Sequence, residues 1–247
     1  MKVAIMQPTF LPWMGYFALL SNVDHFIFLD DVKYARRSWQ SRNRIKTPQG
    51  ELLISIPVAQ ESSSSLINQV KIASSYNHSK LLKQLSSNYK HTPYGNQCID
   101  LVDSAYKNSG SSLAAFNIGI ITSIAQFCNF PTQLSVASDV PNVSGTKAQR
   151  LYSICKSVNA SQYLSPIGSL EYLQADNPFA DDDVALRFLN FQHPHYQQGN
   201  HDFIANLGII DALSWLGPEH FTSLLESSTG SARSIEEQSV FSMDKAA

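Results

Sequence analysis

The chain has 247 residues, of which 43% are hydrophobic and 15% are charged, so it holds enough apolar material for a sizeable core. The formal net charge is −2 and the pI is about 6.4, which excludes the chain-wide basic field that attracts nucleic acid. No apolar run approaches the roughly 18 residues of a membrane span, and the N-terminus lacks the apolar core and cleavage site of a signal peptide. We therefore expect a cytoplasmic protein that has no membrane span and does not bind DNA.

The first part of the chain predicts a strand, a helix and a second strand. An apolar strand at 2–6 stops at Pro8, because proline does not continue a central strand. A helix follows at 12–20, with Pro12 in its first turn, and 25–29 is a second apolar strand. This order is typical of two parallel strands joined by a right-handed crossover. It predicts an α/β fold with a Rossmann-like, mainly parallel sheet flanked by helices.

The rest of the chain continues the alternation and is helix-rich in its middle and C-terminal part. Strands are expected at 51–58, 70–73, 132–137, 161–164 and 184–191. Helices are expected at 79–89, 96–107, 112–127, 147–158 and 209–216, the last of which stops at Gly217-Pro218. We expect one domain over 1–226, in which a helical region at about 79–130 is a candidate subdomain, and a weakly ordered tail at 227–247.

Cys98, Cys128 and Cys155 are the three cysteines of the chain. An odd number at wide spacing, without a CxxC pair, excludes a disulfide framework and a structural zinc site. We expect buried, reduced thiols. The alternative is that Cys155 acts as a nucleophile, which requires a base beside it.

Polar side chains follow the first two predicted strands at the points where these strands end. Gln7 and Pro8 come after the first strand, and Asp30 and Asp31 come after the second. Ligands of open parallel sheets bind beyond the carboxyl ends of the strands. We therefore expect both groups at the rim of one binding site.

The segment after Asp31 is expected to be a loop rich in cationic and aromatic side chains. Arginine forks bind phosphate and carboxylate groups through two hydrogen bonds, and Tyr34, Trp39 or Trp13 would stack on a sugar ring or a base. The alternative is a solvated loop that pairs with the two aspartates. The residues that carry this pattern are Tyr34, Arg36, Arg37, Trp39, Arg42, Asn43, Arg44 and Lys46. We expect this segment, the acidic pair and the first proline loop to share one concave surface.

A second candidate anion site is the start of the helix predicted at 147–158. Ser144-Gly145-Thr146-Lys147 precedes Arg150, and free N–H groups at a helix start beside a lysine bind anions. The spacing is not that of a P-loop. The alternative is an ordinary N-cap with an exposed lysine. Tyr163 ends a predicted strand at the same rim, although Pro166 after it removes a backbone donor.

A histidine-rich loop and one aspartate complete the candidates. His193, His195 and His201 with Asp202 fit no standard metal site, so we expect no metal there, and a general-base role for His195 is the other interpretation. Asp211 stands on an apolar helix, where it caps a neighbouring element or pairs with an arginine.

Several motifs together resemble one protein family. They are, in chain order, QPTFLPWMGYF, VDHFIFLDDVKY, RSWQSRNRIK, ISIPV, SGTKAQRLYSICKSVNASQYLSPIGSLEYL, FQHPHYQQGNHDF and IIDALSWLG. This series resembles the WbqC-like family over residues 1 to about 220. Members of that family occur in gene clusters for bacterial surface polysaccharide and O-antigen synthesis, and the type member has been described as a glycine transferase acting on an amino sugar.

The resemblance implies a transferase that places an aminoacyl (glycyl-like) or acyl group on a nucleotide-linked amino sugar. Arg37, Arg42 and Lys147 would hold phosphates, and Asp30 or Asp31 would orient the amine or accept its proton. The donor stays open between ATP with a free amino acid, an acyl thioester and an aminoacyl-tRNA, and no cofactor is identified. The candidate catalytic residues are Asp30, Asp31 and His195. The candidate substrate-binding residues are Gln7, Pro8, Trp13, Gly15, Tyr16, Tyr34, Arg37, Trp39, Arg42, Asn43, Ser144, Lys147, Arg150 and Tyr163.

Two alternative functions follow from the same residues. The opening of the chain is similar to the nucleotidylyltransferase superfamily, but Trp13-Met14-Gly15-Tyr16 stands where that superfamily has its HxGH histidines. One alternative is therefore an ATP-using ligase or nucleotidylyltransferase-like enzyme with a degenerate motif. The other is a non-catalytic protein of the same pathway that binds a sugar nucleotide.

Overall fold

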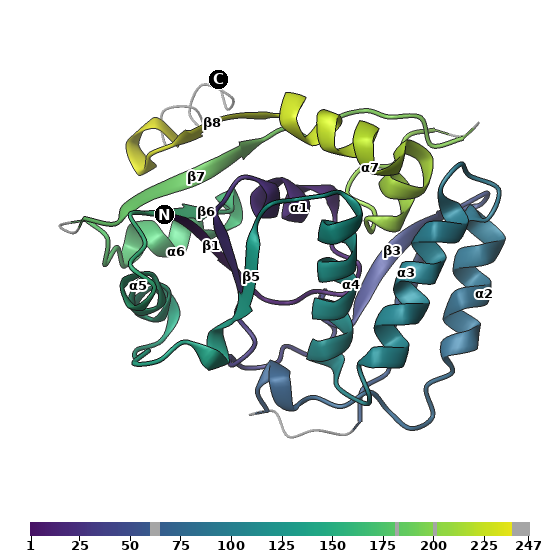
Figure 1. The fold of residues 1–247 in the computed structure, drawn as a ribbon, viewed down its shortest axis with the longest axis horizontal. Coiled ribbons are helices and arrows are strands. Elements are labelled where there is room, and N and C mark those ends of the chain that lie inside the picture. The colour runs from purple at the N-terminus through teal and green to yellow at the C-terminus, as the bar shows by residue number, and fades with distance from the viewer. Residues whose placement is uncertain (60–64, 181–182, 200–201, 239–247) are drawn as a thin grey trace.

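A six-stranded sheet with the order β5-β2-β1-β6-β7-β8 forms the centre of the molecule in the computed structural model (Figure 1). The structure describes residues 1–59, 65–180, 183–199 and 202–238. The sheet strands are β1 Lys2–Met6, β2 His25–Phe28, β5 Gln133–Val136, β6 Gln162–Ser165, β7 Ala185–Phe191 and β8 Thr229–Arg233. The first five are parallel and β8 is antiparallel to β7, which confirms the predicted mainly parallel α/β sheet.

The N-terminal strand pair has the predicted arrangement. β1 and β2 run parallel in a register that pairs Val3 with His25 and Ile5 with Ile27. Helix α1 (Met14–Ser21) connects them, with Trp13 as its N-cap. Pro12 therefore precedes the helix, and the expectation that it stands in the first turn is wrong. β2 is buried along its whole length. Central parallel strands have covered faces on both sides, which is why the sequence shows an unbroken apolar run there.

Helices cover both faces of the sheet (Figure 1). They are α1, α2 His78–Tyr89, α3 Gly95–Asn108, α4 Leu113–Phe127, α5 Lys147–Ser157, α6 Leu170–Ala175 and α7 Ile210–Ser227, with short 3-10 turns η1 Ile67–Gln69, η2 Ala137–Asp139 and η3 Ile167–Ser169. Because successive strand residues face opposite sides, Ala4 of β1 joins the core of α1, α4 and α7, whereas Val3 and Ile5 join the core of α5.

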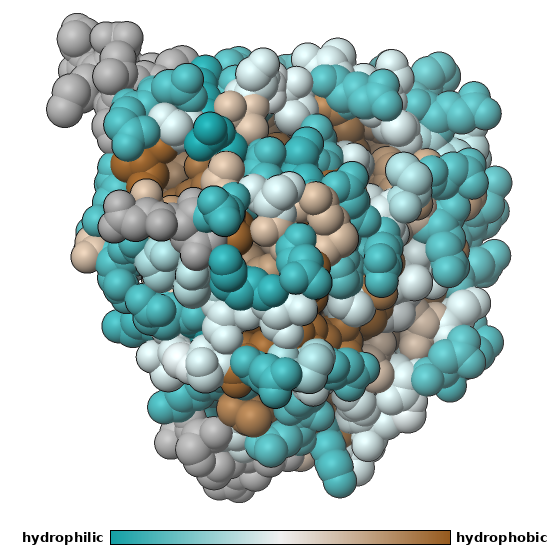
Figure 2. Space-filling model, turned by 60° about the vertical axis from the view of Figure 1, so that its left-hand side comes forward, coloured by the Kyte–Doolittle hydropathy of each residue, from teal (hydrophilic) through white to brown (hydrophobic). Residues whose placement is uncertain are grey.

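The helical region α2–α4 shares its core with the sheet. Leu85 of α2, Val102 of α3 and Ile120 of α4 belong to the same buried cluster as Phe17 of α1 and Phe26 of β2. The candidate subdomain at 79–130 therefore packs its apolar residues into the core that covers one face of the sheet. On the outside, polar residues surround separate apolar patches on the face that Figure 2 shows. Over the residues that the structure describes, no helix is both long and apolar enough to cross a membrane.

The arginine-rich segment is partly a strand, so the expectation of a loop there is wrong. Arg42–Thr47 forms β3 and pairs with β4 (Gly50–Ser55) in an antiparallel hairpin. Asn43 and Ile45 are buried, whereas Arg42 and Arg44, which alternate with them, are less so. The alternation of buried and exposed residues along this strand is not visible in the sequence, because the inward-facing Asn43 is polar. At 70–73 the expected strand is reduced to isolated bridges.

The C-terminal part also differs from the expectation. The helix predicted at 209–216 does stop at Gly217, whose φ of 69° is not helical, but a second helical segment that was not predicted follows, and α7 includes both. A Cβ at Gly217 would come within 2.3 Å of the Tyr94 ring. The predicted weak order from residue 227 is wrong for Thr229–Arg233, which form β8 against β7. An edge strand of this kind is held by backbone hydrogen bonds, and its sequence needs no apolar run. Residues 239–247 lie outside the described residues.

The thiols are where the sequence predicts them. Cys98, Cys128 and Cys155 are free and buried. Burial raises the pKa of the Cys155 thiol to about 12, so it stays protonated near neutral pH. A nucleophile needs the thiolate form, and the interpretation of these residues as buried reduced thiols is therefore confirmed.

Candidate functional site

A cavity of about 640 Å³ lies beyond the carboxyl ends of β1, β2 and β6. The chain leaves β1 toward β2 on one side and later returns to β6 on the other, so β1 and β6 flank the point where the strand order reverses. Open α/β sheets bind their ligands at this point. We call it the switch-point cavity, and its lining residues are Ile5, Met6, Gln7, Thr9, Leu29, Val32, Lys33, Lys147, Arg150, Leu151, Tyr163, Pro166 and Tyr172.

Three cationic side chains line the switch-point cavity. Lys33 follows β2, Lys147 is the first residue of α5, and Arg150 stands on the first turn of that helix. Arg150 forms an ion pair with Asp31 in which the two side chains are 20% and 14% exposed. Among the described residues, Asp31 Oδ1 and Arg150 Nε are buried without a hydrogen-bond partner. The pair therefore fixes the guanidinium group at the cavity while each partner keeps an unused polar atom.

Aromatic and apolar side chains form the rest of the wall. Tyr163 is 1% exposed and stacks on Phe179 with ring centroids 5.4 Å apart. Tyr172 is 40% exposed. Burial raises the pKa of both phenols, so their hydroxyl groups stay protonated and remain hydrogen-bond donors. The cavity thus combines positive charge with neutral donors and ring faces, which suits a ligand with an anionic group attached to a ring.

Gln7 connects the cavity to the segment that follows Asp31. Its Oε1 accepts a hydrogen bond from Gln40 Nε2 at 2.8 Å, and its backbone carbonyl accepts one from Tyr16 Oη at 3.2 Å. Asn117 Nδ2 donates to the carbonyls of Pro8 and Gln40, at 3.1 and 2.8 Å. The first proline loop and the arginine-rich segment are therefore adjacent, but amides rather than arginines join them.

Five of the candidate residues come together here. Gln7, Lys147, Arg150 and Tyr163 line the cavity, and Asp31 lies behind Arg150.

Asp30, the other aspartate, has a different environment. It is 4% exposed and accepts hydrogen bonds from Ser138 N at 3.0 Å, Ser138 Oγ at 2.7 Å and Asn68 Nδ2 at 3.3 Å. Both of its carboxylate oxygens are used, and it joins the end of β2 to the segments around residues 68 and 138. This arrangement is that of a structural carboxylate.

The remaining candidates lie elsewhere. Asn43 donates hydrogen bonds to the carbonyls of Phe10 and Leu11 at 3.0 and 2.7 Å, and Tyr34 Oη donates to Ser41 Oγ at 2.9 Å. Among the described residues that were candidates for binding, those that do not line the switch-point cavity are Pro8, Trp13, Gly15, Tyr16, Tyr34, Arg37, Trp39, Arg42, Asn43 and Ser144.

The exposed tryptophans occupy two other surfaces. Trp39 is 49% exposed, with the guanidinium groups of Arg42 and Arg44 5.9 and 5.7 Å from its ring centroid, and Arg44 pairs with Glu51 at 2.9 Å. The expected shared concave surface is therefore not formed by these arginines. Trp13 lies nearly parallel to His193, and its ring occupies the space that a Cβ on residue 15 would need.

The histidine-rich loop does not reach the cavity in the described part of the chain. His195 is exposed and stacks on Phe203 with centroids 4.2 Å apart. His201 lies outside the described residues. Within the described ranges, no group of three or more His, Cys, Asp or Glu side chains is arranged to hold a metal ion.

Of the charged and aromatic side chains that line the cavity, the sequence analysis did not select Lys33 and Tyr172. Lys33 stands two positions after Asp31, so its nearness to the strand end was a usable signal. Tyr172 stands on α6, which follows β6 and η3. The Pro166 and Gly168 of the connection indicate a turn, but they do not indicate which face of α6 lies at the cavity. Pro166 lines the wall with its ring, although it supplies no amide donor.

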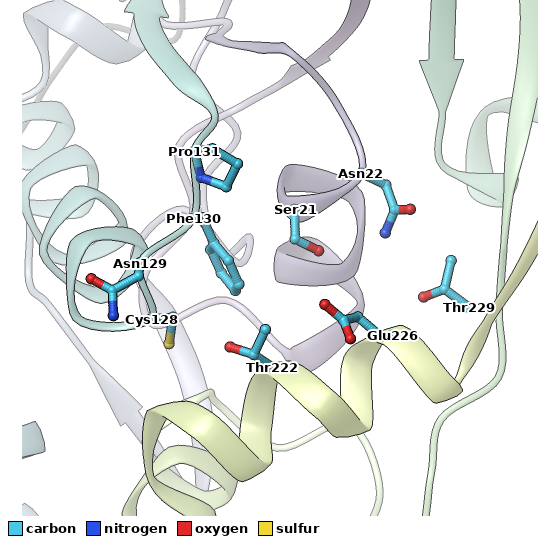
Figure 3. Close-up of a pocket in the computed structure, with 9 residues that line it drawn as sticks. All are labelled: Ser21, Asn22, Cys128, Asn129, Phe130, Pro131, Thr222, Glu226 and Thr229. Carbon is cyan, nitrogen blue, oxygen red and sulfur yellow. The ribbon is translucent and has the colours of Figure 1, made fainter.

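A further cavity of about 430 Å³ lies at the amino ends of β2 and β5 (Figure 3). The Glu226 carboxylate extends from α7 toward Ser21 in this view, and the Thr222 hydroxyl points toward Cys128. Ser21 Oγ and Thr222 Oγ1 already donate to carbonyls of their own helices, at 3.3 and 2.8 Å. This position is at the opposite end of the strands from the one where such sheets bind ligands, and the switch-point cavity is the better candidate.

Comparison with known proteins places the chain in one family. It is 29% identical over 228 residues to the uncharacterized protein Rv1507c of Mycobacterium tuberculosis, a match that covers 88% of this chain and 95% of that protein. No solved structure matches the chain. The sequence model of the WbqC-like protein family matches residues 7–223, nearly all of the fold and most of the switch-point cavity, and the chain belongs to this family.

Proposed function

We propose that the protein is a transferase of bacterial surface polysaccharide or O-antigen precursor biosynthesis. It would place an aminoacyl (glycyl-like) or acyl group on a nucleotide-linked amino sugar bound in the switch-point cavity. The observation that supports this most is the convergence of Lys33, Lys147 and Arg150 beside Tyr163 and Tyr172 at the strand-order reversal. Phosphates need the cations, and a sugar or base needs the ring faces.

The size and charge of the cavity fit this class of ligand. Its volume of about 640 Å³ lies in the range of small-molecule sites. Asp31 holds the Arg150 guanidinium group at the wall of the cavity. A diphosphate would form ion pairs with the two lysine ammonium groups and a bidentate pair of hydrogen bonds with the arginine guanidinium group.

In the chemical step the sugar amine attacks the carbonyl carbon of the activated donor, the C–N bond forms, and the C–O or C–S bond to the leaving group breaks. The leaving group departs with the electron pair of that bond, and the step needs an unprotonated amine and a stabilised oxyanion. In our proposal Asp31 accepts the proton of the amine, because one of its oxygens has no partner among the described residues, whereas Asp30 uses both. A phosphate that draws Arg150 toward it would free Asp31 for this role. The protonated hydroxyl of Tyr163 or Tyr172 would donate to the oxygen that becomes negative.

The nucleotidylyltransferase alternative has weaker support. Its phosphate-holding motif would fall on Trp13-Met14-Gly15-Tyr16, and these residues do not line the switch-point cavity. Trp13 instead packs across Gly15 and beside His193.

The proposal is tested by measuring binding and transfer separately. Isothermal titration with UDP- and dTDP-linked amino sugars should show binding that falls by about tenfold or more in Arg150→Ala and in Lys147→Ala. Lys107→Ala, which removes an exposed charge on α3, is the matched control and should bind like the unchanged protein. Stabilisation by ATP alone would favour a ligase. Transfer from each acyl or aminoacyl donor is followed by mass spectrometry of the sugar nucleotide. Binding of the sugar nucleotide without transfer from any of these donors would favour a non-catalytic binding protein.

A further inference from the structure

Two open cavities share the lining residue Thr229, which follows the end of α7 and begins β8. The first is the cavity of about 430 Å³ in Figure 3, between α1, the segment that joins α4 to β5, and α7. The second, of about 420 Å³, lies between the end of β7 and the start of β8. Because Thr229 lines both, we treat them as two sections of one groove and call it the Thr229 groove. It has no lining residue in common with the switch-point cavity.

The wall of the Thr229 groove carries almost no charge. Among the described residues that line it, Glu226 is the one carboxylate, and no lysine or arginine is present. His193 is neutral near neutral pH, because burial lowers its pKa and its Nε2 accepts a hydrogen bond from the Asn206 backbone N–H at 3.2 Å. Most of the other lining side chains are amides and hydroxyls. This wall offers no ion pair to a phosphate, so it suits a different class of ligand from the switch-point cavity.

The hydroxyl groups of the wall are hydrogen-bond acceptors toward a ligand. Ser21, Ser227 and Thr229 each donate their hydroxyl hydrogen to a backbone carbonyl three or four residues earlier, at 3.3, 3.1 and 2.8 Å. A hydroxyl has one hydrogen and two lone pairs, so these oxygens have only lone pairs left. The exposed Glu226 carboxylate also only accepts. The wall therefore requires a ligand that is rich in donors.

The first section brings several of these acceptors together. In Figure 3 the side chains of Ser21, Asn22, Glu226 and Thr229 extend toward one another across the same space. Asn22 uses one amide hydrogen on the Ala18 carbonyl, at 2.8 Å, and keeps its own oxygen for a ligand. These groups come from α1, from the residue after it and from both sides of the α7–β8 junction, so the fold itself positions them.

The second section adds amides that both donate and accept. Asn190 is partly exposed and Gln192 is exposed, so both amide groups are open to a ligand. The wall is shaped around the first of them, because a Cβ on Gly230 would come within 2.5 Å of Asn190 Nδ2. A ligand that crosses both sections therefore needs groups that donate and accept at once.

We infer that the Thr229 groove binds an uncharged oligosaccharide of two or more units. Sugar hydroxyls both donate and accept, which matches a wall of fixed acceptors with amides beside them. Two neighbouring hydroxyls of one sugar would donate to the two Glu226 oxygens, and the Phe130 ring would pack against the C–H face of that sugar. Each section has the volume of a small-molecule site. The inference does not rest on the proposed function.

The competing ligand is a polyamine, which is also rich in donors. A polyamine would need negative charge, and Glu226 is the one carboxylate among the described lining residues. A single exposed carboxylate contributes little to the binding of a cation. The neutral acceptors and amides therefore favour hydroxyl groups over ammonium groups, and spermidine is the probe that separates the two.

The test uses uncharged sugars as probes of the intact protein. Saturation-transfer NMR with glucose, galactose, mannose and N-acetylglucosamine and with their di- and trisaccharides should identify at least one sugar type that binds. Titration should then show an affinity that rises about tenfold or more from the monosaccharide to the trisaccharide, because only the longer ligand occupies both sections. Arg150→Ala, which changes the switch-point cavity, should leave this binding unchanged.

Two exposed positions allow each section to be tested in a folded protein. Glu226→Gln replaces an acceptor oxygen by a donor and should weaken binding about fivefold or more. Gln192→Ala should weaken the binding of the trisaccharide more than that of the monosaccharide. Glu219→Gln, an exposed position on α7 outside the groove lining, is the matched control and should bind normally.

Four results would overturn the inference. They are that no uncharged sugar binds at millimolar concentration, that the monosaccharide binds as tightly as the trisaccharide, that Glu226→Gln binds unchanged, and that spermidine binds more tightly than every saccharide.

Discussion

Two cavities of the molecule use charge in opposite ways. In the switch-point cavity, cations stand near the rim on the loop after β2 and on the start of α5, and Lys147 is exposed. A smaller cavity, of about 340 Å³, lies between β3, α2 and α7 with Lys46 and Asp211 in its wall, and we call it the Lys46–Asp211 cavity. Its two charged groups are almost completely buried and are held by Tyr89, Tyr196 and Gln198. The cations of the switch-point cavity can change their contacts with little loss of folding stability. The charged groups of the Lys46–Asp211 cavity belong to the contacts that hold the β3–β4 hairpin against the helices.

This difference has a general consequence for finding sites in a sequence. Rim charges follow strand ends and helix starts, so they stand beside recognisable local patterns. Buried charges are placed by tertiary packing, and their partners are far away along the chain. The difference also predicts that mutations in the two cavities affect different properties.

The largest expected effect is the loss of the buried carboxylate. Asp211→Ala should lower the free energy of unfolding by about 3–5 kcal/mol, because the buried hydroxyl groups of Tyr89 and Tyr196 lose their charged acceptor. Lys147→Ala removes an exposed charge from the other cavity and should change it by less than about 0.5 kcal/mol. Urea denaturation of both variants measures the comparison. Similar losses in the two variants would contradict the distinction between the cavities.

Asp31→Asn should mainly affect turnover. If Asp31 accepts the proton of the amine, transfer falls by roughly a hundredfold while sugar-nucleotide affinity changes by less than about fivefold. Asp30→Asn is the matched control, since Asp30 is bonded to Ser138 and Asn68 and should affect stability rather than turnover. A normal transfer rate in Asp31→Asn would remove Asp31 from the mechanism.

The pH dependence of stability should depend on Asp211. Its folded pKa of about 6 is above the ordinary value of 3.8, so the folded state binds the proton more tightly than the unfolded state does. The resulting stabilisation is complete below about pH 4 and is lost as pH rises through about 6, by roughly 2–3 kcal/mol. The groups that face it are Lys46 from β3, Tyr89 from α2 and Tyr196 from the loop.

Thermal unfolding between pH 4 and 7 should therefore show a decline in the unchanged protein that is smaller in Asp211→Asn. The amide variant keeps the shape of the side chain and an oxygen for the phenols, and it lacks the titration. Identical pH profiles for the two proteins would mean that other groups cause the decline.

The smallest expected effect concerns Trp39. Although the sequence marks it as a stacking residue, it is 49% exposed and lies with Arg42 and Arg44 outside the switch-point cavity. Trp39→Ala should change sugar-nucleotide affinity by less than about twofold. A tenfold loss, measured by the titration used for Arg150→Ala, would show that the ligand extends over the hairpin.

The parts that the sequence predicts well are those with a local physical cause. β1, α1 and β2 follow from apolar runs and the positions of proline. The presence of both Lys147 and Arg150 at the cavity follows from their place at a helix start. β3 was missed because Asn43 faces inward, bonded to the carbonyls of Phe10 and Leu11. The alternating pattern of β3 can be recognised only when the folded structure shows that these carbonyl groups accept the hydrogen bonds of Asn43.

The Lys46–Asp211 cavity shows why the rest could not be predicted. Asp211 is conspicuous on an apolar helix, but its partner Tyr89 stands 122 positions earlier and looks like an ordinary core residue of α2. In the sequence, Lys46 looks like the last cation of an exposed arginine-rich segment, but in the structure its side chain is buried. Nothing local in the sequence joins these three residues.

The buried thiols make selective labelling practicable. All three native cysteines are shielded, and burial raises each of their pKa values to about 12, so maleimide dyes should react with them slowly at neutral pH. A single cysteine introduced at Ile167, which is 46% exposed beside the lining residue Pro166, would then carry a fluorophore near the rim without replacement of the native cysteines. Such a probe would report occupancy in real time and would allow large compound collections to be screened.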